Sequence, residues 1–226
     1  MKTTRTRAIV LRRTNYGEAD RILQLLTPEG RRSVIARGVR REKSKLAGGV
    51  ELLAVNDVVI GEGKGELGLI TSARAIQFYR HIMEDYDRLQ FAYFAIKEIS
   101  RASETVDEPE WYELLAELLM ALDAKTIPLF LTETWFYAHC AAVLGRELNL
   151  ERDVHGDKLS AEMTYRYDVG EQGLRPAPNE SGDVTAEHIK LLRLIATKSL
   201  KVLAQIGGVD DILPVCMHVA RAHAAL

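Results

Sequence analysis

The stretch RAIVLRRTNYGEADRILQLLTPEGRRSVIARGVRREKSKLAGGVELL, residues 7–53, decides how the first third of this chain folds. Its apolar residues favour a period of two, and the residues Pro28, Glu29 and Gly30 make a turn between two such runs. This alternation is typical of strands that bury one face. The pattern predicts five strands, at Arg5–Arg13, Asp20–Thr27, Arg31–Arg37, Leu52–Ile60 and Leu67–Phe78.

These strands are expected to form a small barrel over residues 1–79. The glycine-rich run of residues 61–65 supplies a hairpin between the fourth and the fifth strand. An open sheet of this size would leave two exposed edges, and closing the sheet removes them. A five-stranded OB-type barrel is the commonest solution for so short a segment.

After the fifth strand the apolar period changes to 3.6, which indicates a helical domain over residues 80–226 and an α+β fold class. Gly145 and Gly207 are expected to end helices, and Thr185 with His188 resembles a capping box. Within this domain, residues 147–182 are polar and rich in Gly and Pro, but Tyr165 and Tyr167 alternate with polar residues, which favours a short strand or hairpin. Helices are predicted at His81–Ser103, Pro109–Ala124, Ile127–Leu144, Thr185–Ile206 and Ile212–Ala225.

The charge is divided unevenly along the chain, although the formal net charge is only −2. Residues 1–45 hold 13 basic and 4 acidic residues, a balance of +9, whereas residues 46–226 hold 17 basic and 28 acidic ones, a balance of −11. Such a basic segment attracts polyanions such as nucleic acid. The alternative is a solvated positive face without a ligand.

Several motifs in the first third carry a family resemblance. They are YGEADR (residues 16–21), TPEG (27–30), ARGVRR (36–41) and KSK (43–45), followed by GKGELGLITSARAI (63–76) and then by helices. Each motif is weak by itself, but their order and spacing are specific. The chain resembles the RecO family of bacterial recombination mediators.

The resemblance implies a cytoplasmic, nucleoid-associated protein of DNA repair. Such a protein would bind single- and double-stranded DNA, anneal complementary strands, and help RecA load onto DNA coated by single-strand-binding protein. RecR would be its partner, and it would need no cofactor. A cytoplasmic location also agrees with the sequence, because the chain has no apolar run near the ~18 residues that a membrane span requires.

The expected DNA contacts are basic residues of the barrel, because the planar guanidinium of Arg donates two parallel hydrogen bonds to phosphate. The segment Gly38–Gly49 is expected to be a mobile basic loop. Tyr16 is either a residue that stacks on bases or a core aromatic at the end of the barrel. The candidate contacts to the DNA backbone are Arg12, Arg13, Arg31, Arg32, Arg37, Arg40, Arg41, Lys43 and Lys45.

The resemblance also implies that the helical domain binds the acidic, apolar-ended tail of single-strand-binding protein. A groove for such a tail needs an apolar floor with a basic rim. We expect it on one helix, beside Leu191, Leu194 and Ile195. The candidate rim residues are Lys190, Arg193, Lys198 and Lys201.

Many family members carry four cysteines in two CxxC pairs within the region corresponding to residues 147–182, where they form a structural zinc site. This chain has none there, and Asp153 and His155 are the only plausible ligand types near the first pair. Because structural zinc needs more nitrogen or sulfur ligands than these, we expect no zinc. The alternative is an improvised site with His139, Cys140 or His155. The two cysteines, Cys140 and Cys216, are expected to be buried small apolar residues.

Enzyme functions find little support. Residues 63–68 formally match GxGxxG, but a β-type run follows them where a dinucleotide site needs a helix. A metal-dependent nuclease would need clustered carboxylates, and Glu18 and Asp20 alone are too few. No enzymatic activity is therefore expected. The remaining alternative to a DNA mediator is a helical interaction scaffold whose barrel docks protein or RNA.

Overall fold

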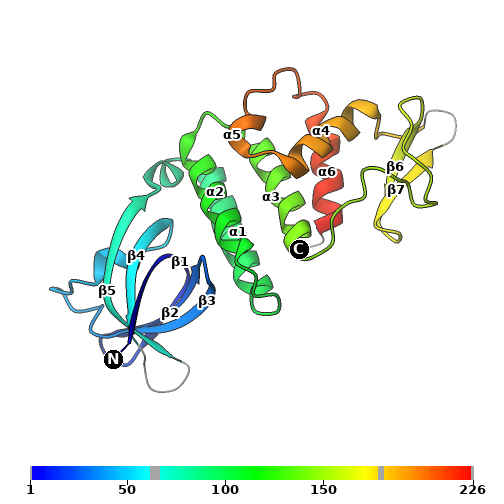
Figure 1. Cartoon of the computed structure of the whole chain (residues 1–226). Helices are drawn as coiled ribbons and strands as arrows, with labels where there is room; N and C mark the ends of the chain where they lie inside the picture. Colours follow the sequence, from blue (N-terminus) through cyan, green and yellow to red (C-terminus); the bar gives the residue numbers. More distant parts are fainter. Residues whose placement is uncertain (1, 62–66, 178–180, 225–226) are drawn as a thin grey trace. The chain divides into compact units, whose positions relative to one another are not determined.

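A computed structural model describes residues 2–61, 67–177 and 181–224 (Figure 1). It confirms the α+β class, with five N-terminal strands followed by helices. The strands form one closed barrel in the order β1-β2-β3-β5-β4. Their bounds are β1 Thr3–Tyr16, β2 Asp20–Thr27, β3 Gly30–Ala36, β4 Ala54–Gly61 and β5 Gly68–Phe78.

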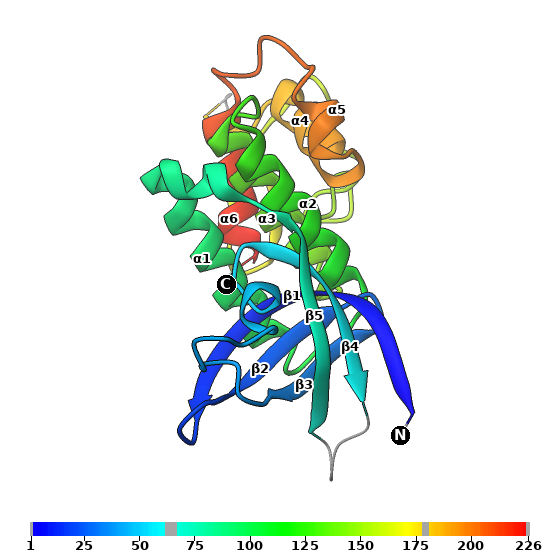
Figure 2. The ribbon, with the colours of Figure 1, turned by 90° about the vertical axis from the view of Figure 1, so that its left-hand side faces the viewer.

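Alternating side chains of the strands fill the barrel, as the period of two predicts. Leu23 and Leu25 on β2 and Val34 on β3 are fully buried in one core cluster. β4 pairs antiparallel with both β1 and β5, and the three strands run beside one another in Figure 2. The barrel closes where β3 pairs parallel with the start of β5, at Val34 with Gly68 and Ile35 with Leu69.

The predicted strand ends lie within two residues of the observed ends, except at the end of β1. β1 is longer than predicted and reaches Tyr16, because its pairing with β2 continues as far as Tyr16 opposite Asp20. The predicted hairpin at residues 61–65 falls mostly outside the described residues. Gly68 begins β5, so a strand and not a helix follows the formal GxGxxG match.

The helices that follow the barrel begin later than the sequence predicts. The expected helix His81–Ser103 is interrupted, because the Asp85 side chain accepts hydrogen bonds from the backbone N–H groups of Asp87 and Arg88 and so caps a new helix. A short 3-10 helix, η2 (Arg80–Glu84), therefore precedes α1 (Tyr86–Ala102). The next helix is α2 (Glu110–Ala124).

Residues Met1–Asp123 form one compact unit, which contains the barrel, α1 and α2. The buried Arg88 on α1 joins the two helices, because its Nη1 donates to the carbonyl of Leu122 at the end of α2 at 3.0 Å. The division into a barrel of residues 1–79 and a helical domain of residues 80–226 follows the change of secondary structure. It stays a proposal about folding units.

Residues Ala124–Leu226 form a second compact unit. The predicted hairpin within residues 147–182 is confirmed, with Tyr165 on its first strand buried. The capping box is confirmed as well, since the side chains of Thr185 and His188 each bond the other residue's backbone. The elements are α3 (Leu129–Val143), β6 (Thr164–Asp168), β7 (Gly173–Ala177), α4 (Ala186–Thr197), α5 (Leu200–Leu203) and α6 (Leu213–Ala224).

The prediction of a single helix over Thr185–Ile206 is wrong, because the helix is interrupted between α4 and α5. Lys198 is extended (φ −114°, ψ 151°), and its carbonyl accepts a hydrogen bond from the Trp135 indole at 3.0 Å. The preceding Thr197 bonds back to the carbonyl of Arg193, which weakens a helix end. Gly207 does not end a helix, since α5 stops at Leu203. Gly145 directly follows Leu144, the C-cap residue of α3, and has φ +69°. It ends this helix, as predicted.

Both cysteines are buried, as expected. Burial raises the pKa of the Cys216 thiol to about 12. Its side chain therefore stays a neutral thiol at neutral pH. Among the helices of the described ranges, none is long and apolar enough to cross a membrane.

Candidate nucleic-acid interface

A hollow of about 610 Å³ lies at one end of the barrel. It gathers residues from the end of β1, the start of β2, the end of β3 and the turns after β3. Its lining consists of Tyr16, Asp20, Ile35, Arg37, Gly38 and Arg41. The hollow therefore brings three of the predicted DNA contacts, Tyr16, Arg37 and Arg41, to one place.

Backbone hydrogen bonds shape the segment Arg37–Leu46, which we call the basic turn segment. Gly38 has φ +63°, and its N–H donates to the Asp20 carboxylate at 2.7 Å. The N–H of Arg40 donates to the carbonyl of Ala19 at 2.9 Å. These two bonds fasten the segment to the β1–β2 hairpin. The role of Asp20 is not apparent from the sequence, because Gly38 follows it by 18 residues.

The two flanks of this segment are fixed to the barrel. Val39 and Val50 belong to the barrel core. Gly49 lies so close to β5 that a Cβ atom there would stand 2.2 Å from the carbonyl carbon of Ala73. The segment expected as a mobile loop is thus a series of hydrogen-bonded turns between anchored ends.

The side chains of the basic turn segment point to solvent. Arg37, Arg41, Lys43 and Lys45 are exposed, and none forms a hydrogen bond or ion pair with another described residue. Arg40 is exposed too, but its Nη1 donates weakly to the carbonyl of Gly17 at 3.3 Å. Four cations are therefore available for a ligand within this segment.

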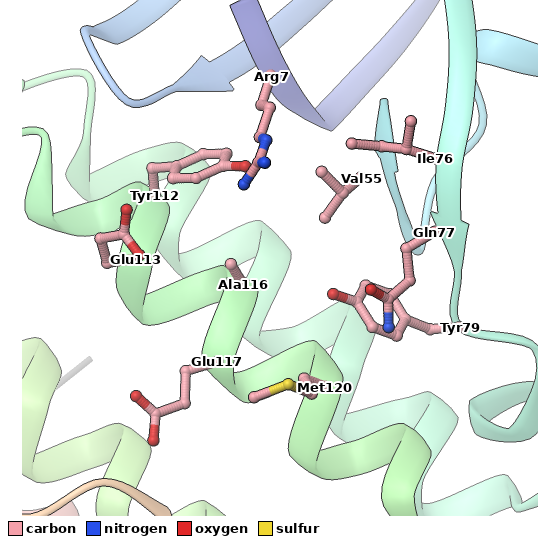
Figure 3. A pocket seen from close by; sticks show the side chains of 10 residues that line it. All are labelled: Arg7, Val55, Ile76, Gln77, Tyr79, Tyr112, Glu113, Ala116, Glu117 and Met120. Carbon is pink, nitrogen blue, oxygen red and sulfur yellow. The ribbon is translucent and has the colours of Figure 1, made fainter. Parts of the chain in front are cut away.

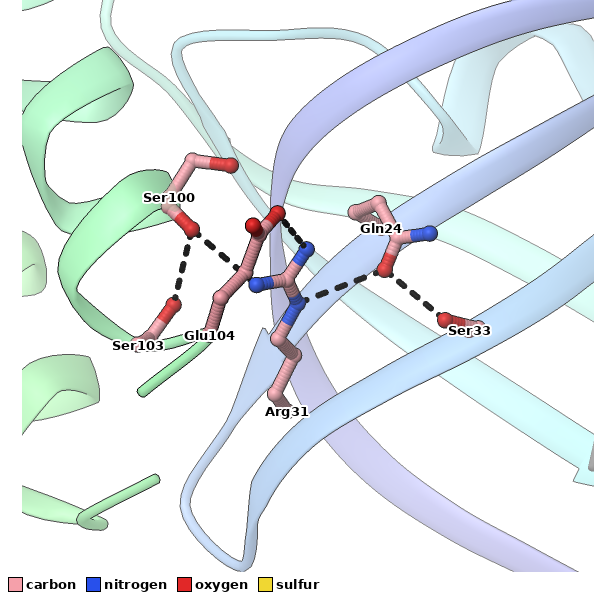
Figure 4. A network of polar contacts seen from close by, with 6 residues as sticks. All are labelled: Gln24, Arg31, Ser33, Ser100, Ser103 and Glu104. Carbon is pink, nitrogen blue, oxygen red and sulfur yellow. Dashed lines mark hydrogen bonds and ion pairs between the residues drawn. The ribbon is translucent and has the colours of Figure 1, made fainter. Parts of the chain in front are cut away.

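The basic residues on the strands of the barrel differ from those of the basic turn segment, because several of them bond other residues of the chain. The side chain of Arg31 is only 15% exposed and donates to the carbonyl of Ser100 at 3.0 Å and to Glu104 at 2.8 Å (Figure 4). Its Nε also reaches Gln24 at 3.3 Å. The structure does not bring Arg31 to the hollow, because its guanidinium already joins β3 to the end of α1.

The other basic residues on the strands differ in how far their side chains are bonded to other residues. Arg13 pairs with Glu51 at 2.6 Å, and Arg32 donates to the carbonyl of Arg31 at 2.9 Å. Arg12 is exposed on β1. Arg5 pairs with Asp57 and holds the pKa of that carboxyl below its ordinary value, mainly through their hydrogen bond.

Tyr16 is 56% exposed, so it is not a core aromatic. The ring stands at the edge of the hollow with Arg37 and Arg41. An exposed ring beside guanidinium groups offers a flat surface for an unstacked base and charges for its phosphates. This combination is typical of proteins that hold single-stranded nucleic acid.

Comparison with known proteins also relates this chain to proteins that act on DNA. The family descriptions "Recombination protein O N terminal" and "Recombination protein O C terminal" match residues 1–79 and 83–211. The chain belongs to the recombination protein O (RecO) family. Membership supports a role in DNA repair and recombination, and the N-terminal part of the family is an OB fold, in agreement with the barrel.

Individual relatives match over much of the chain. Proteins named DNA repair protein RecO from Dehalococcoides mccartyi strain CBDB1 and Rubrobacter xylanophilus are 31% and 30% identical over 92% and 99% of this chain. The match covers 84% and 91% of those two proteins. A RecO protein from Roseiflexus is 31% identical, with 72% of this chain matching 57% of that protein.

The region where many RecO proteins are expected to hold zinc does not fit a metal here. Asp153 accepts hydrogen bonds from the backbone N–H groups of His155 and Asp157, and so closes its own loop. Arg175 bonds Asp168 at 2.6 Å and lies 3.4 Å from the His155 ring nitrogen. Within the described ranges no group of three His, Cys, Asp or Glu residues could hold a metal.

The predicted rim for the tail of single-strand-binding protein is dispersed over two elements. Lys190 and Arg193 lie on α4, Lys198 follows it, and Lys201 is on α5; all four are exposed. The guanidinium of Arg193 donates to the carbonyl of Leu150 at 2.6 and 3.0 Å. Two of the three expected floor residues, Leu191 and Ile195, are buried in the helical core, whereas Leu194 is 36% exposed.

Proposed function

We propose that this chain is a DNA-binding recombination mediator that holds single-stranded DNA in the hollow beside the basic turn segment. The observation that carries the proposal is the exposed Tyr16 together with the unpaired cations Arg37 and Arg41 around one concave surface. Family membership supports it. The proposal contains no catalytic step.

The proposed contacts would bind phosphate and not read base sequence. Lys43 and Lys45 extend the positive charge along the chain next to the hollow. Contacts to phosphate position a nucleic acid but carry no sequence information. Stacking on Tyr16 is also tolerant of sequence, because every base has a flat face. A protein of this kind can hold any strand, which annealing of complementary strands requires.

In the same proposal the protein binds single- and double-stranded DNA, anneals complementary strands and assists the loading of RecA onto DNA coated by single-strand-binding protein. RecR is its proposed partner. The cytoplasm, in association with the nucleoid, is its proposed location. The RecO family resemblance supports these finer statements.

The test replaces three cations of the basic turn segment. Fluorescence anisotropy measures the affinity of the full chain for a labelled single strand across a salt series. Each phosphate contact contributes about 0.7 to the slope of log affinity against log salt. Changing Arg37, Arg41 and Lys43 together to Ala should flatten the slope by about two units and slow annealing.

The matched control removes the same charge elsewhere in the N-terminal unit. Arg74, Arg80 and Lys97 are exposed on β5, η2 and α1, and none lines the hollow. Their replacement by Ala should leave the slope nearly unchanged. Equal losses in both triple variants would overturn the proposed site. Salt-insensitive binding by the natural chain would overturn the proposed function.

A further inference from the structure

A second hollow, of about 450 Å³, lies against the outer side of the barrel within the same compact unit (Figure 3). One wall is formed by β1, β4 and β5 and the other by α2. Ile76 on β5 and Met120 on α2 are half exposed, at 50% and 51%. The two walls thus present apolar side chains to solvent, with Val55 buried at the floor.

Two buried tyrosines line this hollow, and their side-chain hydroxyls are its notable polar groups. Tyr79 and Tyr112 are only 3% and 5% exposed, and neither hydroxyl bonds a residue in the described ranges. Figure 3 shows the Tyr79 hydroxyl directed toward α2 and the Tyr112 hydroxyl next to Arg7. Burial, with smaller contributions from Tyr112 and Asp123, raises the pKa of Tyr79 to about 12, so its hydroxyl stays a donor at neutral pH.

The charge around the hollow is mainly negative. α2 carries Glu110, Glu113, Glu117 and Asp123 and no basic residue, and Glu113 and Glu117 line the hollow. Acidic residues in the first turn stabilise a helix, which accounts in part for Glu110 and Glu113. Arg7, on the opposite wall, is the one cation among the described lining residues.

We propose that this hollow is a docking site for a peptide segment of a partner protein, one that carries an apolar side chain flanked by basic residues. The apolar side chain lies between Ile76 and Met120. The two tyrosine hydroxyls donate to carbonyls of the peptide backbone, and the basic side chains face Glu113 and Glu117.

Chemistry favours a peptide over a nucleic acid at this site. Phosphate groups would be repelled by the two carboxylates, whereas a peptide supplies carbonyl acceptors and cations together. The side chain of Gln77 adds both a donor and an acceptor to the lining. Arg7 orients the peptide, because its positive charge repels the basic residues of the peptide. These residues therefore face Glu113 and Glu117 on the opposite wall.

The experiment measures fluorescence anisotropy of a labelled short peptide with a central leucine flanked by lysines, mixed with the full chain. In one control peptide glycine replaces the leucine, and in the other glutamates replace the lysines. The first peptide should bind, and both controls should bind at least about fivefold more weakly, because each loses one of the two recognised features. Equal binding of the glycine peptide would overturn the proposal.

Variants of the protein locate the peptide. Tyr79→Phe and Tyr112→Phe remove hydroxyls that bond nothing among the described residues, so each should leave the stability of the fold nearly unchanged. Each should lower the affinity for the peptide about threefold to tenfold. Ala116→Arg fills the hollow and should abolish binding. Glu113→Lys should weaken it, whereas Glu110→Lys, in the same helical turn but outside the lining, should not.

Each remaining outcome is decisive. Unchanged peptide affinity in both Phe variants would overturn the proposal, as would equal losses in Glu113→Lys and Glu110→Lys. A single-stranded oligonucleotide that displaces the peptide would assign the hollow to nucleic acid. Binding of DNA by Ala116→Arg should equal that of the natural chain, which separates this site from the proposed DNA function.

Discussion

The strand arginines and the basic turn segment carry the same charge in the same barrel, but they are engaged differently. Arg5, Arg13 and Arg31 each pair with a carboxylate of the chain. Arg37 and Arg41 stand unpaired, as far as the described residues extend, at a hollow that also contains Tyr16. A count of basic residues therefore locates a binding segment only together with knowledge of which charges the fold has already neutralised.

Tyr16 can be tested separately from the cations, because its replacement removes base stacking and keeps the charge of the hollow. Tyr16→Ala should weaken single-strand binding by up to about 3 kcal/mol, because stacking of a base on an aromatic ring contributes about 1–3 kcal/mol. The slope of log affinity against log salt should stay the same. Anisotropy across a salt series measures both, with Tyr93→Ala, an exposed tyrosine on α1, as the control. An unchanged affinity would remove Tyr16 from the interface.

Much of this fold could be predicted from the sequence, and the physical reasons are local. The strands were found because β-branched and apolar residues alternate, as in Asp20–Thr27, whose bounds agree with β2. The break at Lys198 was missed because the Trp135 indole that bonds its carbonyl is 63 residues away. The basic turn segment could be located between two predicted strands, but the engagement of Arg31 depends on its bonds to Ser100 and Glu104, which no local pattern reveals.

Arg31 is expected to serve the stability of the fold and not the binding of DNA. Arg31→Met should destabilise the fold by about 1–2 kcal/mol, since several hydrogen bonds to a largely buried guanidinium are lost and polar partners remain unpaired. Affinity for single strands at fixed salt should change little. Urea unfolding measures the first and anisotropy the second. The reverse result, a stable fold with weakened DNA binding, would place Arg31 among the DNA contacts.

The same contrast exists in the helical unit and predicts a smaller effect. Changing Lys198 and Lys201 together to Ala should lower the affinity for a labelled acidic tail peptide of single-strand-binding protein by roughly fivefold. This is the effect expected for two exposed charges that contribute about 0.5 kcal/mol each. Arg193→Ala should matter less, because its guanidinium is held by the carbonyl of Leu150. If the tail peptide binds equally well to the double variant, its groove lies elsewhere.

The smallest expected effect is a titration. The hydrogen bond and charge of Arg31 hold the pKa of Glu104 below its ordinary value. A lowered pKa in the folded state means that the carboxylate stabilises the fold at neutral pH and loses this contribution as the pH falls through that pKa. NMR titration of the side chain should find the lowered pKa, and Arg31→Met should raise it toward the ordinary value. An ordinary pKa in the natural chain would mean that the pair does not persist in solution.

Gly49 sets a limit on how the interface can vary. A Cβ atom at this position would collide with the backbone of Ala73 and Arg74, which cannot move without distorting β5. In the proposed interface, Lys43 or Lys45 serves mainly through its charge, so exchange of either for Arg should preserve the contribution of that charge to DNA affinity. At residue 49 even the smallest added side chain would force the backbone away from β5. The tolerance of this region to substitution therefore depends on a residue that carries no charge.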